Sequence, residues 1–218
     1  MLLICTSRLF AQAAPTTAPA ISGKLGTPIE LFNGKDYTGW IWYSDPMTKI
    51  EGSWTIKDGA MRCTGTPHGY VRTEKNYGPD YRLIVEYRHV TKGGGGTLFG
   101  ISGPDKVWPK TMQVQGSFGN VGDLVNQGAF NWFVDMARFR HASDADRELK
   151  MAAASEKPLG EWNTVELYVD HDNVWVLVNG VLQNSVSGMD ELTGKIGFQN
   201  EDSVMEFRKV QLTPIEKP

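Results

Sequence analysis

Three stretches of alternating residues each carry two long polar side chains two positions apart. That spacing places both side chains on the same face of a β-strand. The pairs are Glu86 with Arg88, Gln113 with Gln115, and Glu206 with Arg208. Carboxylates, guanidinium groups and amides together supply the donors and acceptors that sugar hydroxyls need. If the three strands are neighbours in a sheet, the pairs form one polar patch that suits a carbohydrate.

Each pair also has a structural interpretation. Charged residues are mostly exposed, so Glu and Arg can screen each other on a solvated outer face of a sheet, and each pair taken alone fits that role better. The convergence of three such pairs favours a site. The sequence therefore predicts a shared surface without excluding the structural role.

Aromatic planes and histidines provide the other groups that such a site uses. Candidate platforms for a sugar ring are four of the seven tryptophans: Trp40, Trp42, Trp108 and Trp132. His68, in the loop before Gly69, is a candidate for substrate binding, and also an alternative base or metal ligand. Alternation turns His89 toward the core, where a structural role is expected. His141 and His171 fall in loops or turns and are expected at the surface.

A short turn-like segment from Gly119 to Asp123 offers the side-chain oxygens of Asn120 and Asp123 to a divalent metal such as Ca²⁺. Two side-chain oxygens are few for a cation that takes ~6–8 oxygen ligands, and the segment can equally be only a turn. The sequence requires no cofactor.

The elements that would position these residues are strands. Period-two alternation recurs between Gly, Asn, Asp and Pro residues, and helix-period segments are nearly absent, so the fold class is all-β with antiparallel sheets. Asn179-Gly180 and Lys57-Asp58-Gly59 each separate two apolar runs and predict hairpins. Gly93 to Gly96 predicts a hairpin turn or bulge that needs positive φ. The clearest strands are residues 54–56, 81–90, 97–101, 111–115, 164–169, 174–178, 195–199 and 204–212.

The segment from Asp135 to Lys157 differs, because it is charged and alanine-rich and shows neither period. It is predicted to be a long loop with one helical turn, either a lid or an exposed excursion.

Composition limits the function. A chain of 218 residues with 40% apolar and 11% aromatic content can bury a full core as one domain, here residues 21–218. A formal net charge of -3 gives no electrostatic reason to bind nucleic acid. No stretch approaches the ~20 apolar residues of a transmembrane helix.

The first 20 residues resemble the end of a secretory signal, with an apolar run and an Ala-Gln-Ala cleavage motif ending at Ala13. We therefore expect a signal remnant and a disordered start over residues 1–20, and a secreted or periplasmic protein. Cys5 would leave with the signal. Cys63 would then be the only cysteine, which excludes an internal disulfide.

Short motifs in consistent order from Ile29 to Pro214 resemble the 3-keto-disaccharide hydrolase family. They are the segments 31–36, 39–40, 69–73, 108–110, 113–115, 119–123, 157–163, 178–180 and 206–208, with Trp54 and Asp58-Gly59. The resemblance implies a jelly-roll sandwich of the concanavalin A-like lectin/glucanase type. It also implies action on glycosides whose glucose unit is a ketone at the third ring carbon.

A ketone at that position acidifies the proton on the second carbon, so a modest base can remove it and the enolate can expel the glycosidic oxygen. Such a site needs a base, a cationic or metal stabiliser, and groups that orient the ring. On this basis Glu86 is the candidate base and Arg88 and Arg208 are candidate enolate stabilisers. The candidate substrate-binding residues are Gln113, Gln115, Glu206, Trp108 and His68.

Two features depart from the family pattern. Relatives usually carry an acid where this chain has Gln113, and Gly93 to Thr97 replaces a more usual Gly-Asn-Ser-Gly. A neutral amide can orient a ring but cannot take its proton. A non-catalytic carbohydrate-binding module is therefore the alternative. A retaining glucanase ranks last, because it needs two carboxylates ~5–5.5 Å apart and no Glu-x-Asp-x-Glu run occurs.

Overall fold

The structure is a computed structural model that describes residues 18–128, 130–141 and 145–218. Most of the predicted signal segment, including Cys5, lies outside these residues. Cys63 is buried and free. No helix within the described ranges is long and apolar enough to cross a membrane, and the one helical element is the short 3-10 turn η1 (Ile50–Gly52).

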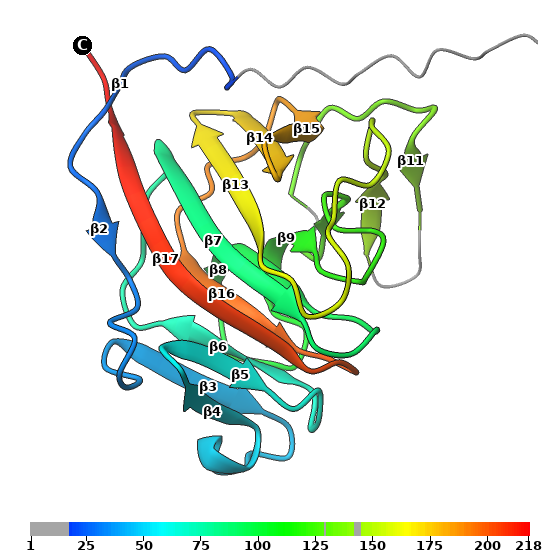
Figure 1. Cartoon of the computed structure of the whole chain (residues 1–218). Helices are drawn as coiled ribbons and strands as arrows, with labels where there is room; N and C mark the ends of the chain where they lie inside the picture. The colour runs from blue at the N-terminus through cyan, green and yellow to red at the C-terminus, as the bar shows by residue number, and fades with distance from the viewer. Residues whose placement is uncertain (1–17, 129, 142–144) are drawn as a thin grey trace, which may run out of the picture.

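Two antiparallel sheets pack face to face. The first has nine strands in the order β15-β14-β13-β7-β17-β5-β4, with β1 and β2 both paired to β17 (Figure 1). Its strands are β1 (Lys24–Leu25), β2 (Ile29–Glu30), β4 (Trp54–Lys57), β5 (Ala60–Cys63), β7 (Tyr81–His89), β13 (Asn163–Asp170), β14 (Asn173–Val178), β15 (Val181–Val186) and β17 (Met205–Glu216).

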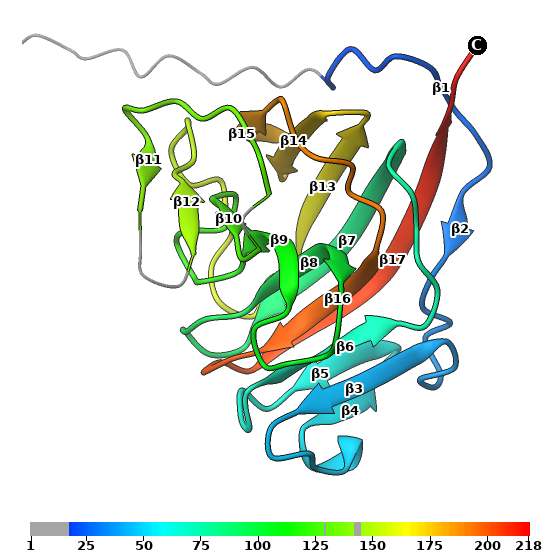
Figure 2. The same cartoon turned by 180° about the vertical axis from the view of Figure 1, so that it is seen from behind.

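The second sheet has eight strands in the order β11-β12-β10-β9-β8-β16-β6-β3 and lies toward the viewer in Figure 2. Its strands are β3 (Trp40–Ser44), β6 (Gly69–Thr73), β8 (Gly96–Ser102), β9 (Lys110–Gln115), β10 (Leu124–Asn126), β11 (Phe139–Arg140), β12 (Asp146–Glu148) and β16 (Lys195–Asn200). Long connections link the two sheets, so strands distant in sequence become neighbours.

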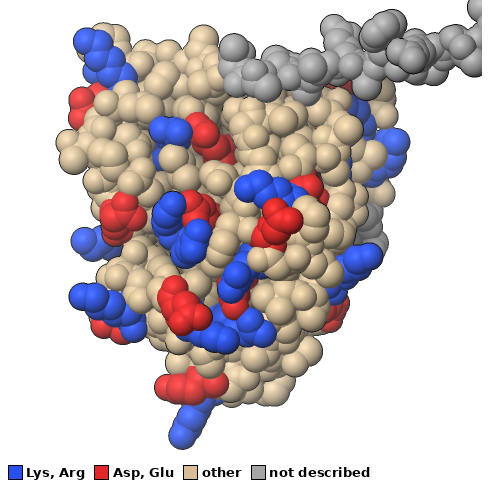
Figure 3. All heavy atoms as spheres, in the orientation of Figure 1, with Lys and Arg blue, Asp and Glu red and all other residues tan. Residues whose placement is uncertain are grey.

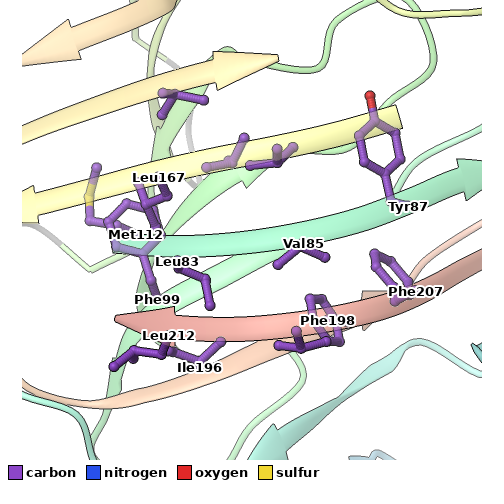
Figure 4. Packing of buried hydrophobic residues seen from close by; sticks show 14 of the residues in the cluster. Leu83, Val85, Tyr87, Phe99, Met112, Leu167, Ile196, Phe198, Phe207 and Leu212 are labelled. Carbon is purple, nitrogen blue, oxygen red and sulfur yellow. The ribbon is translucent and has the colours of Figure 1, made fainter. Parts of the chain in front are cut away.

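The core lies between the sheets and follows from the alternation. In β7 the apolar residues Leu83 and Val85 are fully buried, whereas the intervening residues face outward. The opposite sheet contributes Met112 and Phe198 to the same layer (Figure 4). The rings of Phe198 and Phe207 stack across the interface at a centroid distance of 4.3 Å, which joins the two sheets.

The tight turns confirm the predicted hairpins. Asn179 (φ 50°) and Gly180 (φ 78°) join β14 to β15, and Asp58 (φ 51°) and Gly59 (φ 73°) join β4 to β5. Positive φ at both central residues is the geometry of a type I′ turn, whose twist matches that of the flanking strands.

All eight strands predicted from alternation are present. The short strands β1, β2, β10, β11 and β12, and also β3 and β6, were not predicted. The segment after Asp135 begins with a helical turn, in which the Phe139 amide donates to the Asp135 carbonyl at 2.9 Å, and then forms β11 and β12. Trp40 and Trp42 were expected as sugar platforms. That prediction is wrong, because both lie in the core at 5% exposure.

Candidate functional site

A pocket of about 440 Å³ opens on the outer face of the eight-stranded sheet. Its walls come from strands β9, β10, β11 and β12 and from the segments beside them, and also from the residue that follows β16. The lining residues are Trp108, Gln113, Gln115, Val125, Gln127, Arg140, Ala145, Arg147, Leu149 and Glu201. The pocket combines amides, two guanidinium groups, one carboxyl group and one indole.

Strand register places the lining side chains in one row. Gln113 pairs with Val125, Val125 with Arg147, and Arg147 with Arg140, so these four residues cross β9, β10, β12 and β11 on one face. Directly paired residues point to the same side of a sheet. The neighbouring position Leu124 points inward to the core, which confirms that the row faces out.

The floor of the pocket is a chain of amides centred on Gln113, which is 2% exposed. Its Nε2 donates to the Gly95 carbonyl at 3.0 Å and to Gln199 Oε1 at 2.6 Å, and its Oε1 accepts from Gln127 Nε2 at 2.8 Å. A backbone carbonyl can only accept, so Gly95 fixes which end of the Gln113 amide carries the nitrogen. Both ends of the Gln113 amide are therefore occupied by hydrogen bonds that hold the floor of the pocket together.

Gly96 makes this arrangement feasible. A Cβ atom at Gly96 would lie 2.4 Å from Gln113 Nε2 and 2.9 Å from Gln113 Cγ. Any larger residue would therefore displace the Gln113 side chain from Gln199. The positive φ predicted for this glycine-rich segment is present at Gly93 (152°) and Gly95 (138°). The predicted hairpin turn is wrong, because the segment links β7 to β8, which belong to opposite sheets.

Gln115 is oriented by the backbone that follows it. Its Oε1 accepts from the amide nitrogens of Gly116 at 2.9 Å and Ser117 at 3.1 Å. The Nε2 of Gln115 is consequently the end that remains for the pocket, and it presents a donor. A donor in a defined position can fix a carbonyl or hydroxyl oxygen of a sugar.

Glu201, which follows β16, is the one carboxyl group among the described lining residues. Burial raises its pKa, and the neighbouring Asp202 adds to the effect, whereas His68, the Gly95 amide and Arg147 oppose it. A half-buried carboxylate with a raised pKa is a better proton acceptor than an exposed one. Of the lining groups, Glu201 is the one suited to act as a general base.

The rim carries an exposed indole on an anchored loop. Trp108 is 42% exposed, and its ring centroid lies 5.8 Å from that of His68, whose Nε2 lies 2.8 Å from Asp202 Oδ1. Asp105, in the same loop as Trp108, accepts from Arg72 Nη2 at 2.6 Å and Nε at 2.8 Å. This bidentate ion pair ties the loop to β6 and so positions Trp108.

A buried ion pair holds the hairpin that carries Arg140 and Arg147. Glu148 is fully buried, and its carboxylate lies 2.7 Å from Arg138 Nη2. Arg138 also donates to the Leu149 carbonyl at 2.6 Å. These contacts lie within the hairpin segment, and Asn184 of β15 fixes the segment to the nine-stranded sheet: Arg138 Nη1 donates to Asn184 Oδ1 at 3.1 Å, and Asn184 Nδ2 donates to the Glu148 carbonyl at 2.9 Å. The segment expected as a loop forms one wall of the pocket.

The sequence-predicted residues divide between the two sheets. Gln113, Gln115 and Trp108 line the pocket, and His68 lies beside Trp108. The remaining four predicted residues lie on the outer face of the nine-stranded sheet, on the far side of the core: Glu86, Arg88, Glu206 and Arg208. The prediction that all three strands share one polar surface is therefore wrong. The roles assigned to Glu86, Arg88 and Arg208 depended on that surface.

On that outer face the acids and bases are paired with each other. Glu86 binds Arg208 at 2.6 Å and also Lys209, and Glu206 binds Arg62 at 2.6 Å and also Arg88. Burial opposes ionisation of Glu206, but the hydrogen bonds and charges of Arg88 and Arg62 outweigh it and lower its pKa. Blue and red groups accordingly lie side by side across this face in Figure 3.

Of the two predicted metal ligands, Asp123 has other partners for its side chain. Asp123 is buried, its Oδ1 accepts from the Lys150 amide at 2.8 Å, and its Oδ2 lies 4.0 Å from Arg147. Asn120 and Asp123 close a turn through their backbone atoms at 3.2 Å. Within the described ranges, no group of three or more His, Cys, Asp or Glu residues is arranged to hold a metal ion.

Sequence reasoning missed Glu201, Gln127, Arg140 and Arg147. A signal existed for Glu201, because it continues the alternation of the 195–199 strand on the face of Gln199. The two arginines lie on strands of two and three residues, which are too short to show a period.

The architecture and the pocket define a class: a jelly-roll sandwich of the concanavalin A-like lectin/glucanase type. The fold resembles that of a candidate glycosyl hydrolase from Parabacteroides distasonis (TM-score 0.62, 21% identity, 87% of this chain and 94% of that one). It also resembles a β-glucanase from Bacillus licheniformis (0.57, 13%, 88% and 99%). A third similar structure is a carbohydrate-binding module from Bacillus subtilis (0.54, 10%, 79% and 94%).

Comparison of the sequence with family models identifies the family. A family model described as the 3-keto-alpha-glucoside-1,2-lyase-like domain matches residues 27–213, and the chain belongs to this family. No curated protein sequence matches the chain. The match spans both sheets and every residue of the pocket.

Proposed function

We propose that this protein cleaves glycosides whose glucose unit is a ketone at the third ring carbon, and that the pocket of the eight-stranded sheet is the active site. The observation that carries the proposal is Glu201, a carboxyl group with a raised pKa in a pocket otherwise lined by amides, cations and apolar groups. The family description supports the keto-glucoside as substrate.

The proposed reaction is an elimination. The Glu201 carboxylate removes the proton on the second ring carbon, and the electron pair of that C–H bond forms an enolate with the adjacent ketone. The enolate then collapses, a double bond forms between the first and second carbons, and the glycosidic C–O bond breaks. The departing oxygen takes this proton from Glu201, which returns to its carboxylate form. Addition of water to the double bond completes a net hydrolysis.

The other lining residues have matching roles in this proposal. Arg140 and Arg147 place positive charge in the pocket, where it can stabilise the negative oxygen of the enolate. Gln115 Nε2 can donate to a ring oxygen substituent, and Trp108 offers an apolar plane to the sugar. The proposal replaces Glu86 as base, because its carboxylate is held by two cations on the other sheet.

Isotope labelling tests the mechanism. We expect the protein in D₂O to release the aglycone from an aryl 3-keto-glucoside and to place deuterium on the second carbon of the sugar product. The corresponding glycoside without the ketone is the matched substrate, and it should remain intact. Retention of hydrogen at the second carbon during cleavage would instead indicate direct hydrolysis and would overturn the elimination. Adding a chelator to the same assay tests the calcium expectation for Asn120 and Asp123.

A non-catalytic carbohydrate-binding function is the second candidate, and the amide floor favours it. The resemblance to the family implies an acid at the position of Gln113, and an amide cannot accept the proton. In that case calorimetry would detect binding of the 3-keto-glucoside, while no aglycone release and no deuterium exchange would follow.

We further propose that the protein is exported, on the basis of the signal-like pattern in residues 1–20. Expression of the full chain in a bacterium, followed by N-terminal sequencing of the periplasmic fraction, tests this. A start near Ala14 is expected, and an intact Met1 in the cytoplasm would contradict it.

A further inference from the structure

A tryptophan and two arginines form a stack on the outer face of the nine-stranded sheet, opposite to the pocket. Trp162 immediately precedes β13, and the guanidinium carbons of Arg208 and Arg88 lie 3.9 and 4.7 Å from its ring centroid. Guanidinium groups stacked on an indole lose part of their rotational freedom. The stack therefore holds two cations in defined places close to each other.

Both arginines have N–H groups that are not used in contacts with the glutamates. Each uses its Nε atom for a glutamate, Arg88 for Glu206 and Arg208 for Glu86. The terminal Nη atoms of these two side chains have no hydrogen-bond partner among the residues that the structure describes. A guanidinium group whose outer nitrogens are free can bind a carboxylate through two parallel hydrogen bonds.

The surroundings of the stack are positively charged. Arg62 and Lys209 bind the same two glutamates, so four cations share two carboxylates. Lys157 adds another ammonium group, which donates to the Trp162 carbonyl at 2.9 Å, and Glu161 is the neighbouring acid. The region remains positive on a chain whose formal net charge is -3. We call Arg62, Arg88, Trp162, Arg208 and Lys209 the arginine–tryptophan patch.

We propose that the arginine–tryptophan patch binds an acidic polysaccharide through its carboxylate groups. The patch offers hydrogen-bond donors, positive charge and an aromatic plane, while its own carboxylates are occupied, so its charge is complementary to that of uronic acid units. It extends across β5, β17, β7 and the start of β13, which is the form of surface that an extended chain can follow. This site is separate from the pocket and does not depend on the proposed reaction.

Binding to polygalacturonate, a polymer of uronic acid units, tests the proposal. We expect calorimetry and affinity electrophoresis to detect binding at low ionic strength that weakens as salt is added, because the contacts are between exposed charges. The double variant Arg88→Gln with Arg208→Gln should lose at least tenfold in affinity. Arg82→Gln is the matched control. It removes the same charge from the same face of β7, where Arg82 instead binds Glu166 at 2.8 Å, and it should change the affinity less than twofold.

Two further variants keep the test decisive if the double variant unfolds. Arg208→Lys preserves the charge but lacks the planar fork, and Trp162→Leu removes the stacking plane. Each should weaken binding severalfold while thermal melting shows an intact fold. Equal losses in Arg82→Gln and in the patch variants would overturn the proposal, because they would indicate attraction by overall charge. No binding by the wild type, binding to neutral dextran, or equal affinity for dextran sulfate would also overturn it.

Discussion

The outer faces of the two sheets carry similar residues in different electrostatic settings. On the nine-stranded sheet, Glu86 and Glu206 each bind two cations, and these contacts outweigh burial and lower their pKa values. On the eight-stranded sheet, burial of Glu201 dominates and raises its pKa. A carboxylate stabilised by two partners is a poor base. The comparison indicates that the number of cationic partners decides which glutamate can accept a proton.

The same contrast explains the amide at Gln113. Its Nε2 faces two acceptors, the Gly95 carbonyl and Gln199 Oε1, so this position requires a donor. An ionised acid there would place negative charge against both. On the nine-stranded sheet the neighbours are donors instead of acceptors, because two cationic side chains bind each of Glu86 and Glu206. We therefore expect substitutions on the two faces to have opposite consequences.

The largest expected effect separates the two glutamates in catalysis. Glu201→Gln removes the proposed base and should lower the turnover of a 3-keto-glucoside by about 10²–10⁴-fold, the usual contribution of a general base. Glu86→Gln, the matched variant on the other sheet, should change turnover less than twofold. Steady-state assays of both purified variants measure the contrast. A large loss of turnover in Glu86→Gln with little loss in Glu201→Gln would instead place the active site on the nine-stranded sheet.

The pH dependence of the wild type sharpens this prediction. A general base works when it is ionised, so the rate should rise with pH through the pKa of Glu201. Because burial raises that pKa, the rising limb should lie above the ordinary range of a glutamate. A limb at or below that range would exclude Glu201 as the group that controls the rate.

The second prediction concerns the floor of the pocket. Gln113→Glu should lower the free energy of unfolding at neutral pH by about 1–3 kcal/mol, the usual cost of an unsatisfied buried polar group. The acceptors around it should raise the folded-state pKa of the new acid, so the missing stability should return as the pH falls and the acid becomes protonated. Urea unfolding at several pH values measures this. Gln113→Met, which loses the hydrogen bonds without adding charge, should show no such pH dependence.

Much of the fold follows from local patterns in the sequence. Alternation in β7 and β17 and the turn residues Asn179 and Gly180 report on contacts between neighbours in the chain, and these predictions are confirmed. The short strands β11 and β12 could not be predicted, because two or three residues show no period. Their position depends on contacts of Arg138 and Glu148 with Asn184 of β15, which is distant in the sequence.

The site could be predicted only in part, for a physical reason. Alternation tells which residues share a face of one strand, but not which strands share a sheet. Gln113 was placed correctly on an outer face, and Glu86 was as well, yet the two faces belong to opposite sheets. The assignment of strands to sheets rests on long-range packing, such as the stacked rings of Phe198 and Phe207. For Glu86 the predicted outward orientation is therefore correct, whereas the predicted sharing of a sheet with Gln113 is wrong.

A smaller effect is expected at the rim of the pocket. Trp108→Ala removes an exposed indole that lies beside His68, and it should weaken binding of a 3-keto-glucoside about tenfold, or about 1.4 kcal/mol. Calorimetry on Trp108→Ala measures the loss. Trp162→Ala is the matched control, because Trp162 lies on the outer face of the other sheet, and it should leave this affinity unchanged. Equal losses in both variants would mean that the indole does not contact the sugar.

The smallest effect compares stability at Glu206 and Glu201. The folded-state pKa of Glu206 is lowered, so its ionised form stabilises the fold above the ordinary glutamate range and this contribution is lost as the pH falls. Glu206→Gln should therefore cost about 1 kcal/mol at neutral pH, and less in acid. The folded-state pKa of Glu201 is raised, so its ionised form destabilises the fold, and Glu201→Gln should be more stable than the wild type at neutral pH. Thermal melting of both variants at pH 7 and pH 4 measures the difference in sign. Two destabilised variants would show that Glu201 has a cationic partner as effective as those of Glu206, and it would then be a poor base.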